Sequence, residues 1–187
     1  FQEDFRMKSG QLFADLHLAA VDAAFRAGDL QVLREAVDDP DTIPHTTLPI
    51  DIGTCLEYAI YHSPLLFIRQ LLELGANVNP PREEHAGFPP LLAALSCSRP
   101  IPGSEARPDV PEIVQLLLEF GADPAQRGIN DYTALHMAVA VRNKKAVELL
   151  LAGGADPRLR TTIDDFYTPL EMAGAAGLHD IAAIIET

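Results

Sequence analysis

The segment YTALHMAVAVRNKKAVELLLAGGADP, at residues 132–157, contains the pattern that decides the fold of this chain. Its opening phrase, TALHMA, places apolar residues on one face of a short helix, and Thr133 before them is a residue type that caps helices well. A second helix is predicted after a turn, and Gly154 ends it because glycine accepts a left-handed backbone without strain. The segment therefore predicts a pair of short helices joined by a turn.

The same sequence pattern recurs along the chain at a regular spacing. The alanines that close the opening phrases, Ala59, Ala94, Ala138 and Ala173, lie 35, 44 and 35 residues apart. A period of about 35 residues indicates a stacked helical repeat, in which each unit buries its apolar face against its neighbours. The versions of the opening phrase are TCLEYA at 54–59, PPLLAA at 89–94, TALHMA at 133–138 and TPLEMA at 168–173, and those of the closing phrase are LELGA at 72–76, LEFGA at 118–122 and LAGGA at 151–155.

This pattern resembles the ankyrin repeat family, most closely at residues 132–157 and almost as closely at 53–79. The resemblance implies an all-α solenoid of stacked helix-turn-helix repeats, joined by β-turn linkers known as fingers. It also implies a single domain over residues 1–187 with about five repeats, of which the outer two are degenerate caps. We expect an N-terminal helix or cap at 1–21, repeats at about 22–49, 50–84, 85–128, 129–163 and 164–187, and an insertion at 98–108.

The charge of the chain limits its partners. It has 27 acidic and 14 basic residues, a formal net charge of −13. This balance disfavours nucleic acid and anionic membranes, which attract clustered lysine and arginine. It favours a basic protein partner, or it serves solubility alone. No apolar run approaches the roughly 18 residues that a membrane-spanning helix needs, and we expect a monomer without membrane contact.

Catalytic and metal-binding motifs are missing from the sequence. None of the six histidines has the paired spacing of zinc ligands, and Cys55 and Cys97 form no CxxC pair. The chain contains no nucleophile elbow, no glycine-rich phosphate loop and no HExxH motif. The resemblance gives His136 a structural role, in hydrogen bonding between a finger and its helix. We therefore expect no enzyme activity, no metal and no cofactor.

The cysteines also bear on the compartment. Cys55 and Cys97 are predicted to be too far apart for a disulfide, and two free thiols fit the reducing cytoplasm. Because the first residue is Phe1 and not methionine, an exported protein stays an alternative.

The resemblance implies that finger residues and the free ends of the first helices face a concave groove. The residue before each opening phrase is aromatic in three repeats of four, and a column of aromatic residues beside carboxylates is typical of an interaction hot spot. Packing of these rings between fingers is the alternative, as is a second contact site in the insertion. The candidate partner-binding residues are Tyr61, His62, Phe88, Tyr132, Tyr167, Asp51, Asn130, Asp164 and Asp165.

The sequence thus predicts a non-catalytic protein–protein interaction module that binds through its concave groove and finger edge. One alternative is an acidic inhibitor or immunity protein that neutralises a basic toxin or nuclease. A second alternative, of a different class, is a metal-dependent enzyme that uses the groove as its site.

Overall fold

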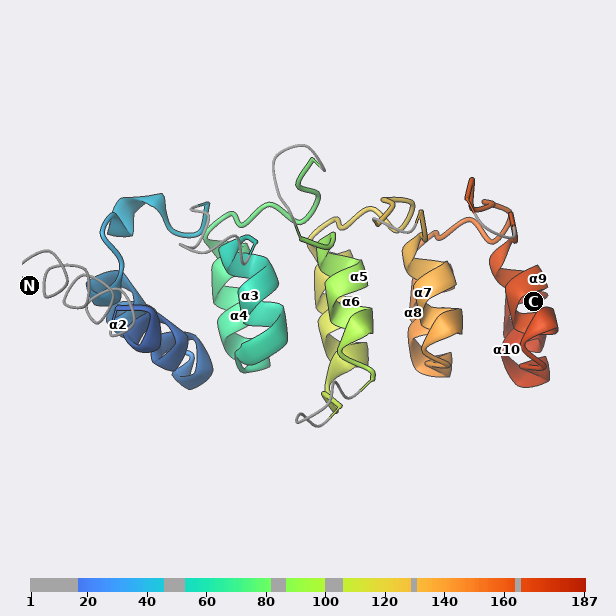
Figure 1. The fold of residues 1–187 in the computed structure, drawn as a ribbon, viewed down its shortest axis with the longest axis horizontal. Coiled ribbons are helices and arrows are strands. Elements are labelled where there is room, and N and C mark those ends of the chain that lie inside the picture. The colour runs from blue at the N-terminus through green and yellow to red at the C-terminus, as the bar shows by residue number, and fades with distance from the viewer. Residues whose placement is uncertain (1–16, 46–52, 82–86, 100–105, 129–130, 164–165) are drawn as a thin grey trace, which may run out of the picture. The chain divides into compact units, whose positions relative to one another are not determined.

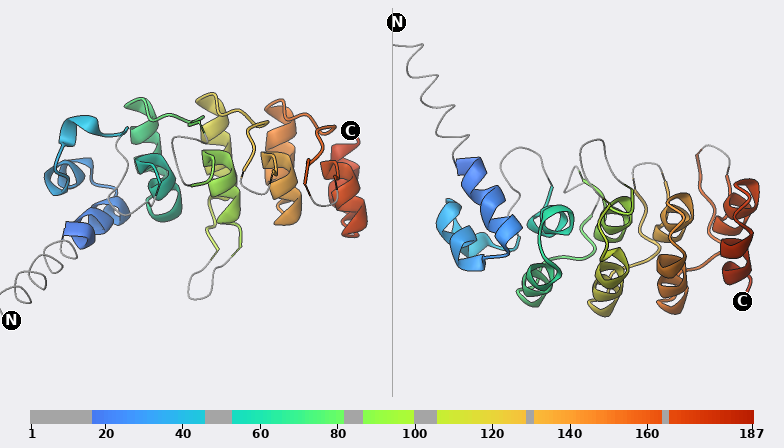
Figure 2. Two further views of the ribbon diagram at one scale, coloured as in Figure 1. Left: turned by 45° about the horizontal axis from the view of Figure 1, so that its top comes forward. Right: turned by 90° about the horizontal axis from the view of Figure 1, so that it is seen from below.

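The computed structural model describes residues 17–45, 53–81, 87–99, 106–128, 131–163 and 166–187. The chain is all-helical, as predicted, and it divides into two compact units, Phe1–Ala76 and Asn77–Thr187 (Figures 1 and 2). None of the helices in these ranges combines the length and the apolar character that crossing a membrane requires.

The first unit has an aromatic core. The ring of Phe25 meets the rings of Tyr58 and Phe67 edge-on, with centroids 4.9 and 5.6 Å away. Residues 17–27 form one continuous helix, so the predicted boundary at residue 21 falls inside a helix that places both Val21 and Phe25 in the core. The other helices of this unit are α2 (Leu30–Ala36), the 3-10 helix η1 (Pro40–Thr42), α3 (Cys55–His62) and α4 (Leu65–Glu73).

The second unit is a stack of three helix pairs. Within each pair, α5 packs on α6, α7 on α8 and α9 on α10. Between pairs, the first helices contact one another in the order α5, α7, α9, and the second helices in the order α6, α8, α10 (Figure 1). This is the predicted stacking of helix-turn-helix repeats. The helices are α5 (Pro90–Ser96), α6 (Val110–Glu119), α7 (Ala134–Ala140), α8 (Lys144–Ala152), α9 (Pro169–Ala175) and α10 (His179–Ile185).

Small side chains allow this stack to close. Ala94, Ala138 and Ala173, which end the opening phrases, have no exposed surface in α5, α7 and α9. A larger residue there would hold neighbouring first helices apart, because helix separation follows the side chains at the contact. Leucine, isoleucine and valine fill the space between first and second helices, and their burial supplies most of the stability of the stack. Examples without exposed surface are Leu92, Ile113, Leu117, Val147 and Leu150.

Each second helix ends and turns in the same way. Gly121 after α6 and Gly154 after α8 have φ values of 84° and 89°, in the left-handed region predicted from the closing phrases. Two residues later, a side chain folds back on the backbone: Asp123 Oδ1 accepts from the N–H of Ala125 at 2.8 Å, and Asp156 Oδ1 from that of Arg158 at 2.9 Å. These local bonds start the extended fingers, here defined as residues 77–88, 123–132 and 156–167.

The described residues at the two ends of the insertion, 98–99 and 106–108, are called its stems here, and the first stem contacts the next helix pair. Asn143 Nδ2 donates to Ser98 Oγ at 3.1 Å, and Arg99 donates to the carbonyl oxygen of Ala140. The two stems also join each other, because the N–H of Arg107 donates to the Cys97 carbonyl at 2.9 Å. Residues 100–105 lie outside the described residues. The stems lie at the end of the helices opposite to the fingers, as expected (Figure 1).

Candidate functional site

The three aromatic residues of the predicted column hold equivalent positions. Phe88, Tyr132 and Tyr167 each directly precede the N-cap residue of a first helix, namely α5, α7 and α9. All three lie in the second unit and are half-buried. Each ring therefore rests partly on the protein and keeps part of its surface open to a partner.

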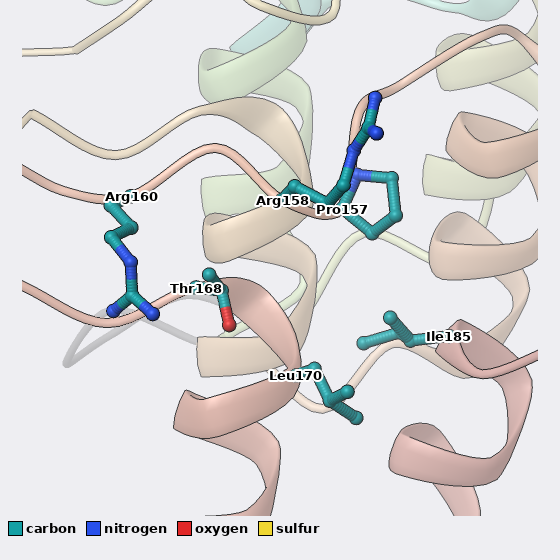
Figure 3. Close-up of a pocket in the computed structure, with 6 residues that line it drawn as sticks. All are labelled: Pro157, Arg158, Arg160, Thr168, Leu170 and Ile185. Atoms are coloured by element: carbon teal, nitrogen blue, oxygen red, sulfur yellow. The ribbon is translucent and has the colours of Figure 1, made fainter.

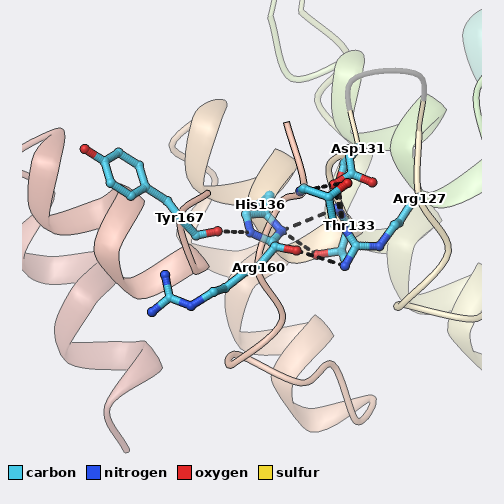
Figure 4. A network of polar contacts seen from close by, with 7 residues as sticks. Arg127, Asp131, Thr133, His136, Arg160 and Tyr167 are labelled. Atoms are coloured by element: carbon cyan, nitrogen blue, oxygen red, sulfur yellow. Dashed lines mark hydrogen bonds and ion pairs between the residues drawn. The ribbon is translucent and has the colours of Figure 1, made fainter. Parts of the chain in front are cut away.

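Tyr132 stacks on the histidine of its own repeat. Its ring centroid lies 5.7 Å from that of His136, with the planes 26° apart. The imidazole joins the N-cap residue of α7 to the 156–167 finger (Figure 4). Its Nδ1 lies 3.4 Å from the backbone nitrogen of Thr133 and 2.8 Å from the Thr133 hydroxyl. Its Nε2 lies 3.0 Å from the carbonyl oxygen of Tyr167. A backbone N–H can only donate and a carbonyl can only accept, so Nδ1 is the acceptor and Nε2 carries the proton.

The surroundings of His136 keep this tautomer neutral. The side chain has no exposed surface, and burial lowers its pKa below the usual value, although the bond to the Tyr167 carbonyl acts in the opposite direction. A buried neutral imidazole with both nitrogens bonded is a structural element and is poorly placed to move protons. This agrees with the role that the family resemblance gives His136.

The 123–132 and 156–167 fingers are joined by a second set of bonds (Figure 4). Asp131 Oδ2 lies 2.8 Å from Arg127 Nη1 and accepts from the Thr162 hydroxyl at 2.9 Å and from the Thr162 N–H. Arg127 Nη2 also donates to the carbonyl oxygen of Arg160 at 2.9 Å. Burial opposes ionisation of Asp131, but the bonds from Thr162 and Arg127 outweigh it and lower the pKa of the carboxyl.

Arg160 ties the 156–167 finger to helix α9. Its guanidinium holds both carboxylate oxygens of Glu171 at 2.8 Å and donates to the carbonyl of Phe166 at 2.9 Å. Glu171 also accepts from the N–H of Thr168 at 2.8 Å, which completes a capping box. Arg160 lowers the pKa of Glu171 to about 2, with a further contribution from Thr168. These bonds connect the described part of the 156–167 finger to the start of α9.

Gly53 is the one member of this register that is not aromatic, and the first unit shows why. A Cβ atom at Gly53 would lie 2.1 Å from Oε2 of Glu57, whose side chain is only 4% exposed. The buried carboxylate occupies the space that a larger residue at position 53 would need. The φ of Gly53 is 95°, in the left-handed region, so a side chain there would be strained and would also require Glu57 to move.

Tyr61 and His62 lie at the C-terminal end of α3 in the first unit and are half-buried. The His62 ring packs against that of Tyr58, with centroids 4.4 Å apart, and the centroid of the Tyr61 ring lies 6.2 Å from that of His62. The Tyr58 hydroxyl donates to Asp22 Oδ1 at 2.6 Å, and Asp22 pairs with Arg26. These two candidates therefore belong to an aromatic cluster with one ion pair at its side.

The remaining candidates, Asp51, Asn130, Asp164 and Asp165, lie outside the described residues. The described part of the finger edge is mixed in charge, because Arg127, Arg158 and Arg160 face Asp131, Asp156 and Glu171. A net acidic charge at this edge would therefore have to come from carboxylates such as Asp164 and Asp165.

An open depression of about 400 Å³ lies beside the last helix pair (Figure 3). Pro157, Leu170 and Ile185 give it apolar walls, and Arg158 and Arg160 stand on the finger side. Both arginines are paired with carboxylates, at 3.0 Å for Arg158 with Asp156. The depression therefore offers no strong attraction to an anion and fits an apolar side chain better.

The described residues contain no group of three histidine, cysteine or acidic side chains placed to hold a metal ion. Both cysteines are free thiols, and burial raises the pKa of Cys55 to about 12 and that of Cys97 above its usual value. Thiols that stay protonated are poor nucleophiles.

The sequence pattern singled out Tyr132 and Tyr167 but not the residues directly before them. Asp131 and Phe166 each stand one residue before a tyrosine of the column, 35 residues apart, and both have positive φ values, of 62° and 55°. That spacing could have drawn attention to them. The arrangement places half-buried aromatic residues at equivalent positions of three successive repeats, which suits binding to an extended surface.

Comparison with known proteins identifies the repeats. The family model described as Ankyrin repeats (3 copies) matches residues 106–185. Protein PhlB of Serratia liquefaciens is 42% identical over 70 residues, which cover 37% of this chain and 30% of PhlB. Ankyrin repeat and KH domain-containing protein mask-1 of Caenorhabditis elegans is 30% identical over 179 residues, 95% of this chain and 6% of mask-1. L-asparaginase of Dirofilaria immitis is 45% identical over 71 residues, 37% of this chain and 12% of that protein. The chain therefore spans less than a third of each relative.

Proposed function

Because this chain is an ankyrin repeat protein, we propose that it is a non-catalytic module that binds another protein through its finger edge and the adjoining groove. Ankyrin repeats are generally protein–protein interaction modules, which supports this class of function. The partner is proposed to contact Phe88, Tyr132 and Tyr167.

One observation carries this proposal: the aromatic column stands on fingers that are already cross-linked. Asn79 Nδ2 donates to the Gly121 carbonyl at 2.8 Å, and Gln126 Nε2 donates to the Pro80 carbonyl at 2.7 Å. His136 and Arg127 make the corresponding links to the 156–167 finger. Groups fixed before binding lose little conformational entropy when a partner docks, so more of the contact energy appears as affinity.

The relatives support the same interpretation. The names PhlB, mask-1 and L-asparaginase do not point to one common activity, and the aligned part is a minority of each protein. A segment shared among such different proteins is better explained by binding than by chemistry. We accordingly propose that this chain has no catalytic role, and that its compartment is the cytoplasm because Cys55 and Cys97 are not joined in a disulfide.

A sharper candidate is an acidic inhibitor or immunity protein for a basic toxin or nuclease. The net charge of −13 favours it, because opposite charge speeds the encounter with a basic partner. A partner that is released at high salt and has a high isoelectric point would support this candidate. A neutral or acidic partner would be compatible with the general binding proposal and would contradict the inhibitor or immunity role.

The test is a pull-down with the whole chain from cells of its source, followed by an alanine scan against the purified partner. Tyr132→Ala and Tyr167→Ala should each weaken binding by about 2 kcal/mol, a magnitude common for half-buried aromatic anchors. Lys145→Ala, on the exposed side of α8, is the matched control and should bind as the wild type does. Circular dichroism checks that each variant folds.

The candidate carboxylates Asp51, Asp164 and Asp165 should act mainly on the association rate, and their effect should weaken as salt rises. If both tyrosine variants fold and bind like the wild type, while changes within residues 98–108 abolish binding, the column is not the site and the insertion is.

A further inference from the structure

The 156–167 finger exposes two large apolar side chains. Ile163 is 43% exposed and Phe166 is 58% exposed. Among the described residues of the second unit, these are the large hydrophobic side chains with substantial exposure. They lie three residues apart in the same finger, whereas the large apolar residues of helices α8, α9 and α10 are buried or half-buried.

The backbone of Phe166 is in an unfavourable conformation. Its φ of 55° lies in the left-handed region, where a bulky residue is a genuine outlier because its Cβ crowds the following carbonyl oxygen. Asp131 has the same conformation one repeat earlier, and there the side chain has a local role, because it binds Arg127 and Thr162. The bonds made by its side chain therefore account for the left-handed backbone of Asp131. The ring of Phe166 cannot make such bonds, so they do not account for the backbone of Phe166.

The fold uses the backbone of this site. The Phe166 carbonyl accepts from Arg160 at 2.9 Å, and the Tyr167 carbonyl accepts from the Thr161 N–H at 3.1 Å and faces His136. Glycine at position 166 could make the same backbone contacts without strain. The Cβ of Phe166 therefore costs stability while its ring remains largely in water, and such local strain is found most often at sites with a function.

The charge around this pair indicates what could cover it. Arg158 and Arg160, the cations of the finger, are each paired with a carboxylate of the chain itself, Asp156 and Glu171. The sequence between Ile163 and Phe166 adds two further acids, and the whole chain carries −13. A second copy of the chain would bring like charge to this finger, whereas a basic segment would be attracted to it.

We propose that Phe166 and Ile163 form an apolar anchor for a basic segment of a partner protein. The apolar side chains of that segment cover the two residues, and its lysine or arginine residues are attracted by the net negative charge of the chain. This inference rests on the proposed binding function and adds to it a specific anchor outside the aromatic column and a chemical class of partner.

The test uses a random peptide library displayed on phage and selected on the whole chain. Enriched sequences should combine apolar residues with lysine or arginine. A synthetic peptide of that sequence should bind at least about tenfold more weakly to Phe166→Gly and to Phe166→Ala, and its affinity for the wild type should fall as salt rises. Leu66→Ser, which removes a residue 67% exposed on α4, is the matched control and should leave binding unchanged.

The two variants at position 166 separate binding from folding. Both remove the ring, but only glycine relieves the backbone strain, so Phe166→Gly should unfold at a higher denaturant concentration than Phe166→Ala. Loss of binding in a variant at least as stable as the wild type cannot come from unfolding. A Phe166→Gly variant clearly less stable than the wild type would overturn the inference, because the ring would then contribute to the fold.

The remaining outcomes distinguish this inference from the proposed function. Peptides that need Tyr132 and Tyr167 but bind Phe166→Gly normally would overturn the anchor and leave the proposed function standing. Peptides indifferent to all three changes would count against both. Acidic peptides, no enriched peptide, or self-association of the wild type that Phe166→Gly abolishes would each overturn the inference.

Discussion

Substitution of Gly154 tests the repeat register most directly, because the residue has a single structural role. It follows α8 with φ at 89°, and in this conformation its N–H reaches the Leu151 carbonyl at 3.0 Å while the N–H of Ala155 reaches the Leu150 carbonyl at 2.9 Å. These bonds satisfy the last carbonyl groups of the helix. A Cβ atom at Gly154 would meet no other heavy atom within 4 Å. A side chain there therefore introduces no steric clash, and its cost is conformational.

The expected loss of stability can therefore be worked out from the backbone conformation alone. A residue with a Cβ in the left-handed region costs about 1–2 kcal/mol relative to glycine. Replacement of glycine also stiffens the unfolded chain, which returns about 0.4–1 kcal/mol. We expect Gly154→Ala to lose a net amount of about 1 kcal/mol, and Gly154→Val to lose more because its branched side chain is further restricted.

Urea unfolding followed by circular dichroism measures this effect. With a slope of about 2 kcal/mol per molar urea, a loss of 1–2 kcal/mol lowers the midpoint by about 0.5–1 M. Gly174→Ala is the control: Gly174 lies within α9, its φ is not positive and a Cβ there also meets no atom within 4 Å. Alanine in a helix is favoured over glycine by about 0.5–1 kcal/mol, so this midpoint should not fall. An unchanged midpoint for Gly154→Val, or an equal fall for Gly174→Ala, would refute the reasoning.

Three further outcomes are expected. His136→Leu should lower the free energy of unfolding by about 1–3 kcal/mol in urea titrations, because the buried N–H of Thr133 loses its acceptor; an equal stability would show that water or another group replaces the ring. Arg160 lowers the pKa of Glu171 to about 2 from 4.5, so the ionised carboxylate stabilises the fold above the unfolded pKa, and this contribution is lost as pH falls from about 5 to 2. The melting temperature of Glu171→Gln should accordingly approach that of the wild type as pH falls through this window, and a constant difference would contradict the pKa shift. EDTA should leave the melting temperature unchanged, since metal-linked stability scales with site occupancy; a fall that zinc reverses would return the metal-dependent alternative.

The elements of the fold could be predicted from the sequence because their causes are local. Helix α8 is the second helix predicted within residues 132–157, and it runs from Lys144 to Ala152 because Asn143 caps it and glycine follows it. The caps at Thr133 and Thr168 and the left-handed Gly121 and Gly154 depend on neighbours within about four residues. The regular spacing of the phrases then indicates stacking, because every unit repeats the same apolar faces. The aromatic column follows from the same register.

The tertiary structure alone decided how the fingers are held and what they expose. Asp131 meets Thr162 across 31 residues, and Ser98 meets Asn143 across 45, and no local pattern specifies such pairs. From the sequence, Gly53 only interrupts the series of aromatic residues, whereas the structure shows the buried Glu57 side chain in the space beside it. Phe166 has no local signal for a left-handed backbone, which local preferences oppose. Its carbonyl accepts from Arg160 six residues away, and the next carbonyl, that of Tyr167, meets His136 of the neighbouring repeat, a bond that can form only when the stack has formed.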